Sequence, residues 1–329
     1  MLIAAATLLA LSASTALAPA PADGRIRGAS LGLFAVDRDY DYGVMVREIA
    51  SRGATDLLVV VEWTQAHRLS HDPGPGARTA STRALRRTIR QARADGLRVG
   101  VMPILRLPDT APGRWRGTLD PVDPAAWMRA YGDHLVALAA LAEAEDVVRL
   151  VAGSELVSMQ RHEALWLDLV ERVRSAFHGE VAYAANWDAL EVPFAHALDS
   201  LGVSAYFPLA AEGERAGLSV MTRRWERPLR RLDRLRRDTG LPVFLAEVGY
   251  PAHPEAASAP WRPSAAGPAD VELQADLFRA FCAAAAEDRR VAGYYVWNWF
   301  GWGGPNDPGY SPRGKPAAAV LETCMRRAA

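Results

Sequence analysis

The feature that most constrains the fold of this chain is a regular alternation of short apolar segments with helix-like segments. The predicted strands are Ala29–Phe34, Leu57–Trp63, Arg98–Leu105, Val147–Ala152, Glu180–Ala185, Ser200–Phe207, Pro242–Ala246 and Ala292–Trp297. Most of them are continuously apolar, which is typical of parallel strands covered on both faces. The predicted helices are Tyr42–Ser51, Ser81–Ala94, Pro124–Ala144, His162–Phe177, Ala189–Ala197, Met221–Asp238, Ala269–Asp288 and Pro316–Arg327.

Eight such units in a chain of 329 residues predict an α/β protein with a single (β/α)8 TIM barrel. The competing architecture is an open doubly wound sheet. That fold would be expected to carry a glycine-rich phosphate-binding turn after its first strand, and no such turn follows Ala29–Phe34. We therefore expect residues 23–329 to form one barrel domain.

The connections between the predicted elements are short on one side and long on the other. Links from helix to strand are tight, as at Asp95–Leu97 and Thr239–Leu241. Links from strand to helix are long, as at Arg106–Asp123 and Gly249–Pro268. The long loops therefore gather at the C-terminal ends of the strands, which is the face where barrel enzymes carry their active sites.

Two glutamates stand at that face. Glu155 follows the fourth predicted strand and Glu247 follows the seventh, so their carboxylates are expected to face each other across the barrel mouth. A carboxylate at the end of a buried strand is costly unless something there uses it. Glycoside hydrolysis needs such a pair, because one group protonates the leaving oxygen while the other attacks the anomeric carbon or activates water. The alternative is a pair of structural salt bridges to nearby arginines.

Side chains suited to a sugar site stand at the ends of other strands. Tyr206 could donate a hydrogen bond to a carboxylate and keep it ionised. Tryptophan rings stack on pyranoses, and amides or guanidinium groups bind hydroxyls. The substrate-binding candidates are Trp63, Trp187, Trp297, Trp299, Asn186, Asn298 and Arg106. Since neighbouring strand residues point to opposite faces, they cannot all line the site, and we expect Trp297 to form its floor. Glu62 either faces the site or pairs with an arginine.

This arrangement resembles the clan A retaining glycoside hydrolases. Within that clan it is most similar to glycoside hydrolase family 113, on the segments Ser30–Phe34, Asp39–Gly43, Gly153–Glu155 and Ala246–Tyr250. The resemblance covers nearly the whole mature chain. It implies a retaining mechanism without a metal or other cofactor, usually with endo-β-1,4-mannanase activity. It also implies that Glu155 is the acid/base and Glu247 the nucleophile.

One residue departs from the clan pattern. Most members have asparagine directly before the acid/base, whereas this chain has Ser154. That asparagine usually contacts the sugar 2-hydroxyl, and serine reaches less far, so another residue such as Asn186 would have to replace it. The departure leaves the identity of the sugar open. Two alternative functions also remain: a carbohydrate-binding or scaffold barrel without catalysis, and a hydrolase of a bacterial exopolysaccharide.

The N-terminus resembles an export signal. Residues 1–18, or up to residue 22, combine a short apolar stretch with an Ala16-Leu17-Ala18 cleavage pattern, although no Lys or Arg precedes the apolar stretch. We therefore expect a periplasmic or extracellular protein. No other run is long enough to cross a bilayer, so no integral membrane segment is expected after removal of the signal.

Composition and the remaining motifs narrow the possible partners. With 38 basic and 38 acidic residues, the chain offers no electrostatic case for binding nucleic acid. His67 and His71 have a metal-ligand spacing but lie in a loop rich in Pro and Gly, without an obvious third ligand, so no metal is expected. Cys282 and Cys324 either pair in an exported protein or stay as two buried thiols. We expect a monomer that acts on a polysaccharide or oligosaccharide.

Overall fold

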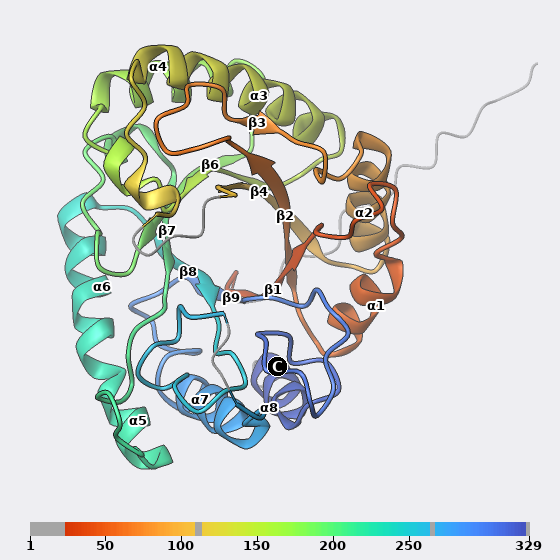
Figure 1. Ribbon diagram of the computed structural model, residues 1–329, viewed down its shortest axis with the longest axis vertical. Coiled ribbons are helices and arrows are strands. Elements are labelled where there is room, and N and C mark those ends of the chain that lie inside the picture. Colours follow the sequence, from red (N-terminus) through yellow and green to blue (C-terminus); the bar gives the residue numbers. More distant parts are fainter. Residues whose placement is uncertain (1–23, 109–113, 264–266, 327–329) are drawn as a thin grey trace, which may run out of the picture.

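The computed structural model describes residues 24–108, 114–263 and 267–326. Its strands surround a common centre and its helices form an outer ring (Figure 1). The barrel strands are β1 (Ile26–Gly32), β2 (Asp56–Thr64), β4 (Arg98–Arg106), β5 (Arg149–Ser154), β6 (Glu180–Asn186), β7 (Ser200–Ser204), β8 (Val243–Val248) and β9 (Gly293–Val296). All neighbouring pairs among them are parallel, and β1 pairs with both β2 and β9, so the sheet closes. The predicted TIM barrel is confirmed.

A two-residue strand, β3 (Gly74–Pro75), pairs antiparallel with the end of β2 and lies outside the barrel itself. The predicted signal segment, residues 1–18 or up to 22, lies outside the described residues. Among the residues that are described, no helix is both long enough and apolar enough to cross a membrane.

The helices are α1 (Gly43–Ser51), α2 (Thr82–Ala94), α3 (Pro124–Ala144), α4 (Glu163–Arg174), α5 (Leu218–Arg224), α6 (Glu226–Thr239), α7 (Val271–Ala284) and α8 (Pro316–Arg326). Three of these helices begin at a capping residue whose side chain accepts a hydrogen bond from a backbone N–H group. The caps are Ser81 for α2, Asp123 for α3 and Asp270 for α7. These caps explain why the predicted starts of α2 and α3 agree with the structure to within one residue.

Two helix predictions were wrong in detail, and proline explains both. The segment 189–197 contains no α-helix, only a 3₁₀ turn at Ala195–Ala197, because Pro193 lacks a backbone donor and its ring would clash within a helix. The predicted helix 221–238 is divided at Trp225 into α5 and α6. Pro228 stands in the first turn of α6, where its missing N–H needs no partner. In a helix continuing from α5, the same residue would remove a backbone hydrogen bond.

The barrel interior and the layer under the helices are separate apolar clusters. Leu58, Val60, Met102, Ile104 and Phe244 belong to the interior cluster, together with smaller residues such as Ala182 and Ala184. Alternate residues on the same strands, including Leu57 and Val59, pack outward beneath the helices. Because the interior is filled, only the layer at the C-terminal ends of the strands is open to substrate.

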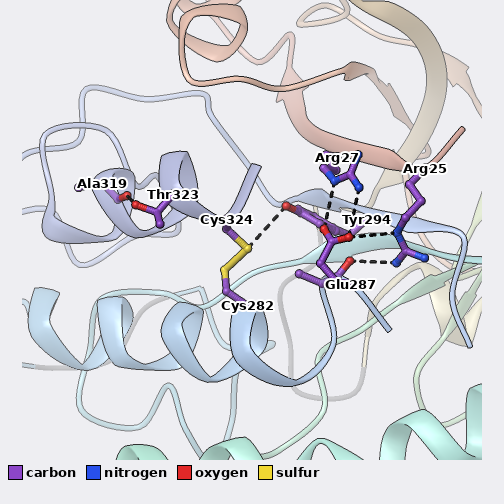
Figure 2. Close-up of a disulfide and its surroundings, with 9 residues drawn as sticks. Arg25, Arg27, Cys282, Glu287, Tyr294, Ala319, Thr323 and Cys324 are labelled. Atoms are coloured by element: carbon purple, nitrogen blue, oxygen red, sulfur yellow. Dashed lines mark hydrogen bonds and ion pairs between the residues drawn. A yellow bond between two sulfur atoms is a disulfide. The ribbon is translucent and has the colours of Figure 1, made fainter. Parts of the chain in front are cut away.

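A disulfide joins Cys282 on α7 to Cys324 on α8, with Cα atoms 5.7 Å apart (Figure 2). Of the two alternatives for these cysteines, the structure therefore has the paired form. The hydroxyl of Tyr294 approaches the sulfur of Cys324 at 3.7 Å. Next to it, Glu287 pairs with Arg25 and Arg27. The bond thus connects the last two helices at the seam where β9 closes the barrel on β1.

Reducing this disulfide is expected to destabilise the protein without preventing it from folding. The bond spans 42 residues of chain, and loop-closure entropy for such a span gives about 4 kcal/mol. We expect the free energy of unfolding to fall by about 2–4 kcal/mol in the Cys282→Ser, Cys324→Ser double variant. Urea denaturation with and without dithiothreitol measures this difference. A wild-type protein insensitive to dithiothreitol would contradict the pairing.

Candidate active site

The side chains at the barrel mouth come from alternate positions at the ends of the strands. Phe34, Tyr206 and Trp297 all belong to the interior cluster and form its upper layer. Glu62 on β2 and Arg106 on β4 lie two residues beyond the interior residues Val60 and Ile104, so they point into the same space. This layer receives Glu155 from the end of β5 and Glu247 from β8.

Irregular backbone directs both glutamates into the mouth. Glu155 has a φ of +55°, in the left-handed region that is costly for a residue other than glycine, and its N–H donates to the carbonyl of Ala184 on β6. On β8, strict alternation would direct Glu247 outward, because Ala246 faces the interior. A register shift between β7 and β8 at this point re-aims Glu247 inward.

One arginine contacts both carboxylates. Nη2 of Arg116 lies 2.7 Å from Oε2 of Glu155 and 3.9 Å from Oε1 of Glu247. Arg116 comes from a 3₁₀ turn, η1 (Arg116–Thr118), in the long loop after β4, and its Nε donates to the carbonyl of Ser154 at 3.2 Å. Glu155 is 5% exposed and Glu247 1% exposed. The two carboxylates therefore meet at the mouth and share one guanidinium group.

Glu247 also accepts hydrogen bonds from two hydroxyl groups. Tyr206 donates to Oε2 at 2.7 Å, and Ser154 donates to Oε1 at 3.4 Å. Burial and the nearby charge of Glu155 raise the pKa of Glu247 to about 7, against the opposing effects of Arg116 and the two hydroxyls. Burial likewise raises the pKa of Tyr206 well above its ordinary value, so this residue remains a hydrogen-bond donor. The predicted contact between Tyr206 and a carboxylate is present.

The raised pKa of Glu247 predicts a stability that depends on pH. The folded protein retains a proton on Glu247 that the unfolded chain has already released, so stability falls as pH rises between about 4.5 and 7. The quantity to compare is the free energy of unfolding of the wild type minus that of Glu247→Gln. This difference is expected to decrease by on the order of 3 kcal/mol as the pH rises across that window. Urea denaturation at pH 4.5 and 7.5 measures it. A difference independent of pH would show that Glu247 titrates normally.

Aromatic rings belong to, or pack against, the interior cluster at the barrel mouth. Trp297 packs against Phe34, with ring centroids 6.2 Å apart. It can approach β8 because residue 249 is glycine, where a Cβ would stand 2.7 Å from the carbonyl oxygen of Trp297. Trp187, after β6, stacks on the half-exposed Trp261 with centroids 5.5 Å apart. Trp297 therefore faces inward, as expected for the floor, and Trp187 belongs to an aromatic pair at the rim.

Two other predicted contacts are corrected by the structure. Trp63 points outward and packs against Tyr131 of α3, because it is the strand neighbour of the inward-facing Glu62. Trp299 is 1% exposed, and its indole nitrogen donates to Glu48 of α1. The prediction for Asn298 is not contradicted, because this residue is partly exposed and only its side-chain oxygen is used, to accept the backbone N–H of Phe300.

The two remaining candidates stand at the mouth with partners of their own. Asn186 ends β6 and donates to Asp188 at 2.6 Å. Arg106 pairs with Glu62 at 2.5 Å and lies over the ring of Phe34, while Arg78 approaches the other oxygen of Glu62 at 3.9 Å. Both alternatives for Glu62 are therefore true, since it faces the mouth and pairs with arginines.

A cavity of about 630 Å³ extends from this edge of the mouth. Its walls include Glu62, Asp72, Arg78, Arg106 and His134. The side chains of Arg78 and Arg106 are 57% and 47% exposed. In the described part of the chain, this cavity included, no group of three or more His, Cys, Asp or Glu side chains is arranged to hold a metal ion.

Sequence reasoning missed Arg116, Phe34 and Tyr310. Tyr310 stacks edge-on against Tyr206 at 6.1 Å and donates to the carbonyl of Pro260 at 2.7 Å. Phe34 could have been found from the alternation along the first strand. Arg116 and Tyr310 lie in long loops with no local pattern that marks them, so no sequence signal was available.

A closed (β/α)8 barrel with two buried carboxylates sharing its mouth, bordered by tryptophan and tyrosine, defines a barrel glycoside hydrolase. Residues 45–302 match Glycoside Hydrolase Family 113, and the chain belongs to this family. The family resemblance noted in the sequence is thereby confirmed, and the protein is an enzyme that hydrolyses glycosidic bonds.

Several solved structures share the fold. The GH113 β-mannanase AaManA from Alicyclobacillus acidocaldarius, in complex with ManMIm, is 24% identical, with a TM-score of 0.81 over 93% of this chain and 98% of that one. A complex of a GH113 β-1,4-mannanase is 23% identical, with a TM-score of 0.80 over 92% and 99%. GH5_18 from Streptomyces cattleya, in complex with Manβ1-4GlcNAc, is 17% identical, with a TM-score of 0.62 over 92% and 80%. No protein with a curated function matches the sequence.

Proposed function

We propose that this protein is a retaining glycoside hydrolase that cleaves β-1,4-linked mannan within the chain, with Glu155 as acid/base and Glu247 as nucleophile. The observation that carries the proposal is the contact of both carboxylates with one nitrogen of Arg116. Oε2 of Glu155 and Oε1 of Glu247 are therefore no farther apart than the sum of their distances to Nη2 of Arg116. That limit accommodates the spacing of about 5–5.5 Å found in retaining enzymes and reaches only the lower edge of the roughly 6.5–9.5 Å found in inverting ones.

In the first step Glu247 attacks the anomeric carbon while the proton of Glu155 passes to the glycosidic oxygen. The bond between that carbon and oxygen breaks, and the leaving sugar departs with a new hydroxyl group. In the second step Glu155, now a carboxylate, takes a proton from water as the water oxygen attacks the same carbon. Glu247 departs as a carboxylate. One water is consumed for each linkage, and the anomeric configuration is retained.

The surrounding residues support binding of a neutral sugar chain. Trp297 offers a ring at the floor, and the stacked Trp187 and Trp261 form a flat aromatic surface at the rim. Tyr206 orients Glu247 through its 2.7 Å hydrogen bond. The choice of mannan follows from family membership and from the two similar structures that are described as β-mannanases.

One observation favours a different substrate for the same reaction. Arg78 and Arg106 are about half exposed on the wall of the 630 Å³ cavity beside the mouth. Guanidinium groups bind carboxylates well. The second candidate is therefore a bacterial exopolysaccharide whose side groups include carboxylated sugars.

The test is the release of new reducing ends from mannan, glucomannan, xylan, β-glucan and an acidic exopolysaccharide, followed by analysis of product lengths. Mannan is expected to yield short oligosaccharides, and NMR of the first product should show the β-anomer. Retention of polysaccharide without new reducing ends would identify a binding protein instead. The α-anomer as the first product would remove the retaining mechanism.

We also propose that the protein is exported. The apolar N-terminus with its Ala-x-Ala pattern supports export. The Cys282–Cys324 disulfide supports it as well, because such bonds persist mainly in oxidising compartments. Expression of the full chain in a bacterium, followed by fractionation and N-terminal sequencing, is expected to find mature protein that starts between residues 19 and 23 outside the cytoplasm.

A further inference from the structure

Arg116 places a cation against both of the proposed catalytic carboxylates. Its guanidinium group stands between the two carboxylates, 2.7 Å from Glu155 and 3.9 Å from Glu247. The side chain is only 18% exposed. A backbone hydrogen bond from Nε to the carbonyl of Ser154 holds it in this orientation.

The two carboxylates that Arg116 contacts must both approach the scissile bond. The glycosidic oxygen must come within about 2.6–3.2 Å of the acid/base. The anomeric carbon must come within about 3–3.5 Å of the nucleophile. A nitrogen that is 2.7 Å from one carboxylate and 3.9 Å from the other already contacts the two groups that the substrate has to reach.

The charge of Arg116 is favourable in the empty site. The guanidinium group lies 2.7 Å from Glu155 and 3.9 Å from Glu247, so it offsets the repulsion between the two buried carboxylates.

We infer that Arg116 is an internal cation that closes the resting site and that the sugar chain must displace it from between Glu155 and Glu247. This inference rests on the proposed function. Binding energy from sugar units away from the reacting bond drives the displacement. Departure of the guanidinium leaves the carboxyl group of Glu155 free to contact the glycosidic oxygen. Arg116 is thus a gating residue that acts through the two carboxylates, not a group that reacts with substrate.

The inference predicts a specific change in ligand selectivity. Arg116→Met removes the charge and keeps much of the length. A cationic piperidine with mannose-like hydroxyls should bind this variant at least about tenfold more tightly than the wild type, since it no longer competes with an internal cation. The neutral lactam of the same ring should also bind more tightly, by a smaller factor of about threefold, because it too no longer has to displace the guanidinium. Isothermal titration calorimetry of both ligands gives the ratio.

Arg161→Met is the matched control. Arg161 is more than half exposed and approaches only the exposed Asp120, at 3.8 Å, among the described carboxylates. For the Arg161→Met variant, the ratio of the piperidine affinity to the lactam affinity should equal that of the wild type. A purely structural role for Arg116 would make Arg116→Met bind both ligands more weakly and leave the ratio unchanged. This result, or the absence of binding of both ligands by Arg116→Met, would overturn the inference.

A second measurement avoids the variant, in case Arg116→Met does not fold. A crystal structure of the wild type with the lactam should show the guanidinium group withdrawn from both carboxylates. A guanidinium still bridging Glu155 and Glu247 beside the bound ring would overturn the inference. Hydrolysis of polysaccharide by the wild type decides the proposed function separately, so either proposal can fail while the other stands.

Discussion

Replacing Glu247 with alanine is expected to abolish hydrolysis and leave the barrel folded. The carboxylate that would form the covalent intermediate is removed, so kcat should fall by at least about 10⁴-fold, as for other nucleophiles. Glu247 is buried beside a second carboxylate, which raises its pKa to about 7, so its loss relieves an unfavourable contact. The free energy of unfolding at pH 7.5 should therefore be unchanged or larger. Initial rates on mannan and urea denaturation measure the two effects.

Azide gives a sharper readout for the same variant. In Glu247→Ala the space left by the carboxylate admits azide, which attacks an aryl β-mannoside from the nucleophile side and yields the α-azide. Glu145→Ala is the matched control, because Glu145 is equally buried but pairs with Arg86 and Arg90 away from the mouth. That control should lose stability and keep activity. If Glu247→Ala hydrolysed mannan at the wild-type rate, Glu247 could not be the nucleophile.

Replacing Glu155 with glutamine is expected to produce a loss that depends on the leaving group. The leaving group in mannan is a sugar hydroxyl, which departs slowly unless it is protonated. Hydrolysis of mannan should therefore be about 10³-fold slower. An aryl β-mannoside with an acidic phenol needs no such proton, so its first step should remain fast. The glycosyl-enzyme then accumulates, because no general base activates water. Steady-state rates on both substrates and mass spectrometry of the intact protein measure these effects.

Added azide distinguishes this role from general damage to the site. In Glu155→Gln azide needs no base, so it should accelerate turnover of the aryl substrate and give the β-azide, opposite in configuration to the product of Glu247→Ala. The same loss on both substrates, without acceleration by azide, would show that Glu155 positions substrate rather than transferring a proton.

Local patterns in the sequence predicted most of the barrel. The apolar runs locate the eight barrel strands, because a parallel strand covered on both faces needs them. The two wrong helix predictions also have causes in the local sequence. The helix expected over residues 189–197 is excluded by Pro193, and the division of α5 from α6 precedes Pro228, so both breaks could have been predicted from the proline positions.

The orientation of side chains at the mouth was less predictable. A strand that is apolar on both faces carries no alternation to show which residues point inward. Trp63 was therefore assigned to the site, although Glu62 beside it faces the mouth. Trp299 was assigned to the site because it follows the last barrel strand. Its indole nitrogen instead donates to Glu48 of α1, a residue 251 positions away in the chain.

By itself the sequence determined the order of strands and helices, the face that carries the long loops and the presence of a glutamate after β5 and on β8. These features depend on residues that are neighbours in the chain. Only the tertiary structure decided that a register shift directs Glu247 inward and that Arg116 lies between the two carboxylates. Both depend on contacts between strands and loops far apart in sequence, which no local pattern encodes.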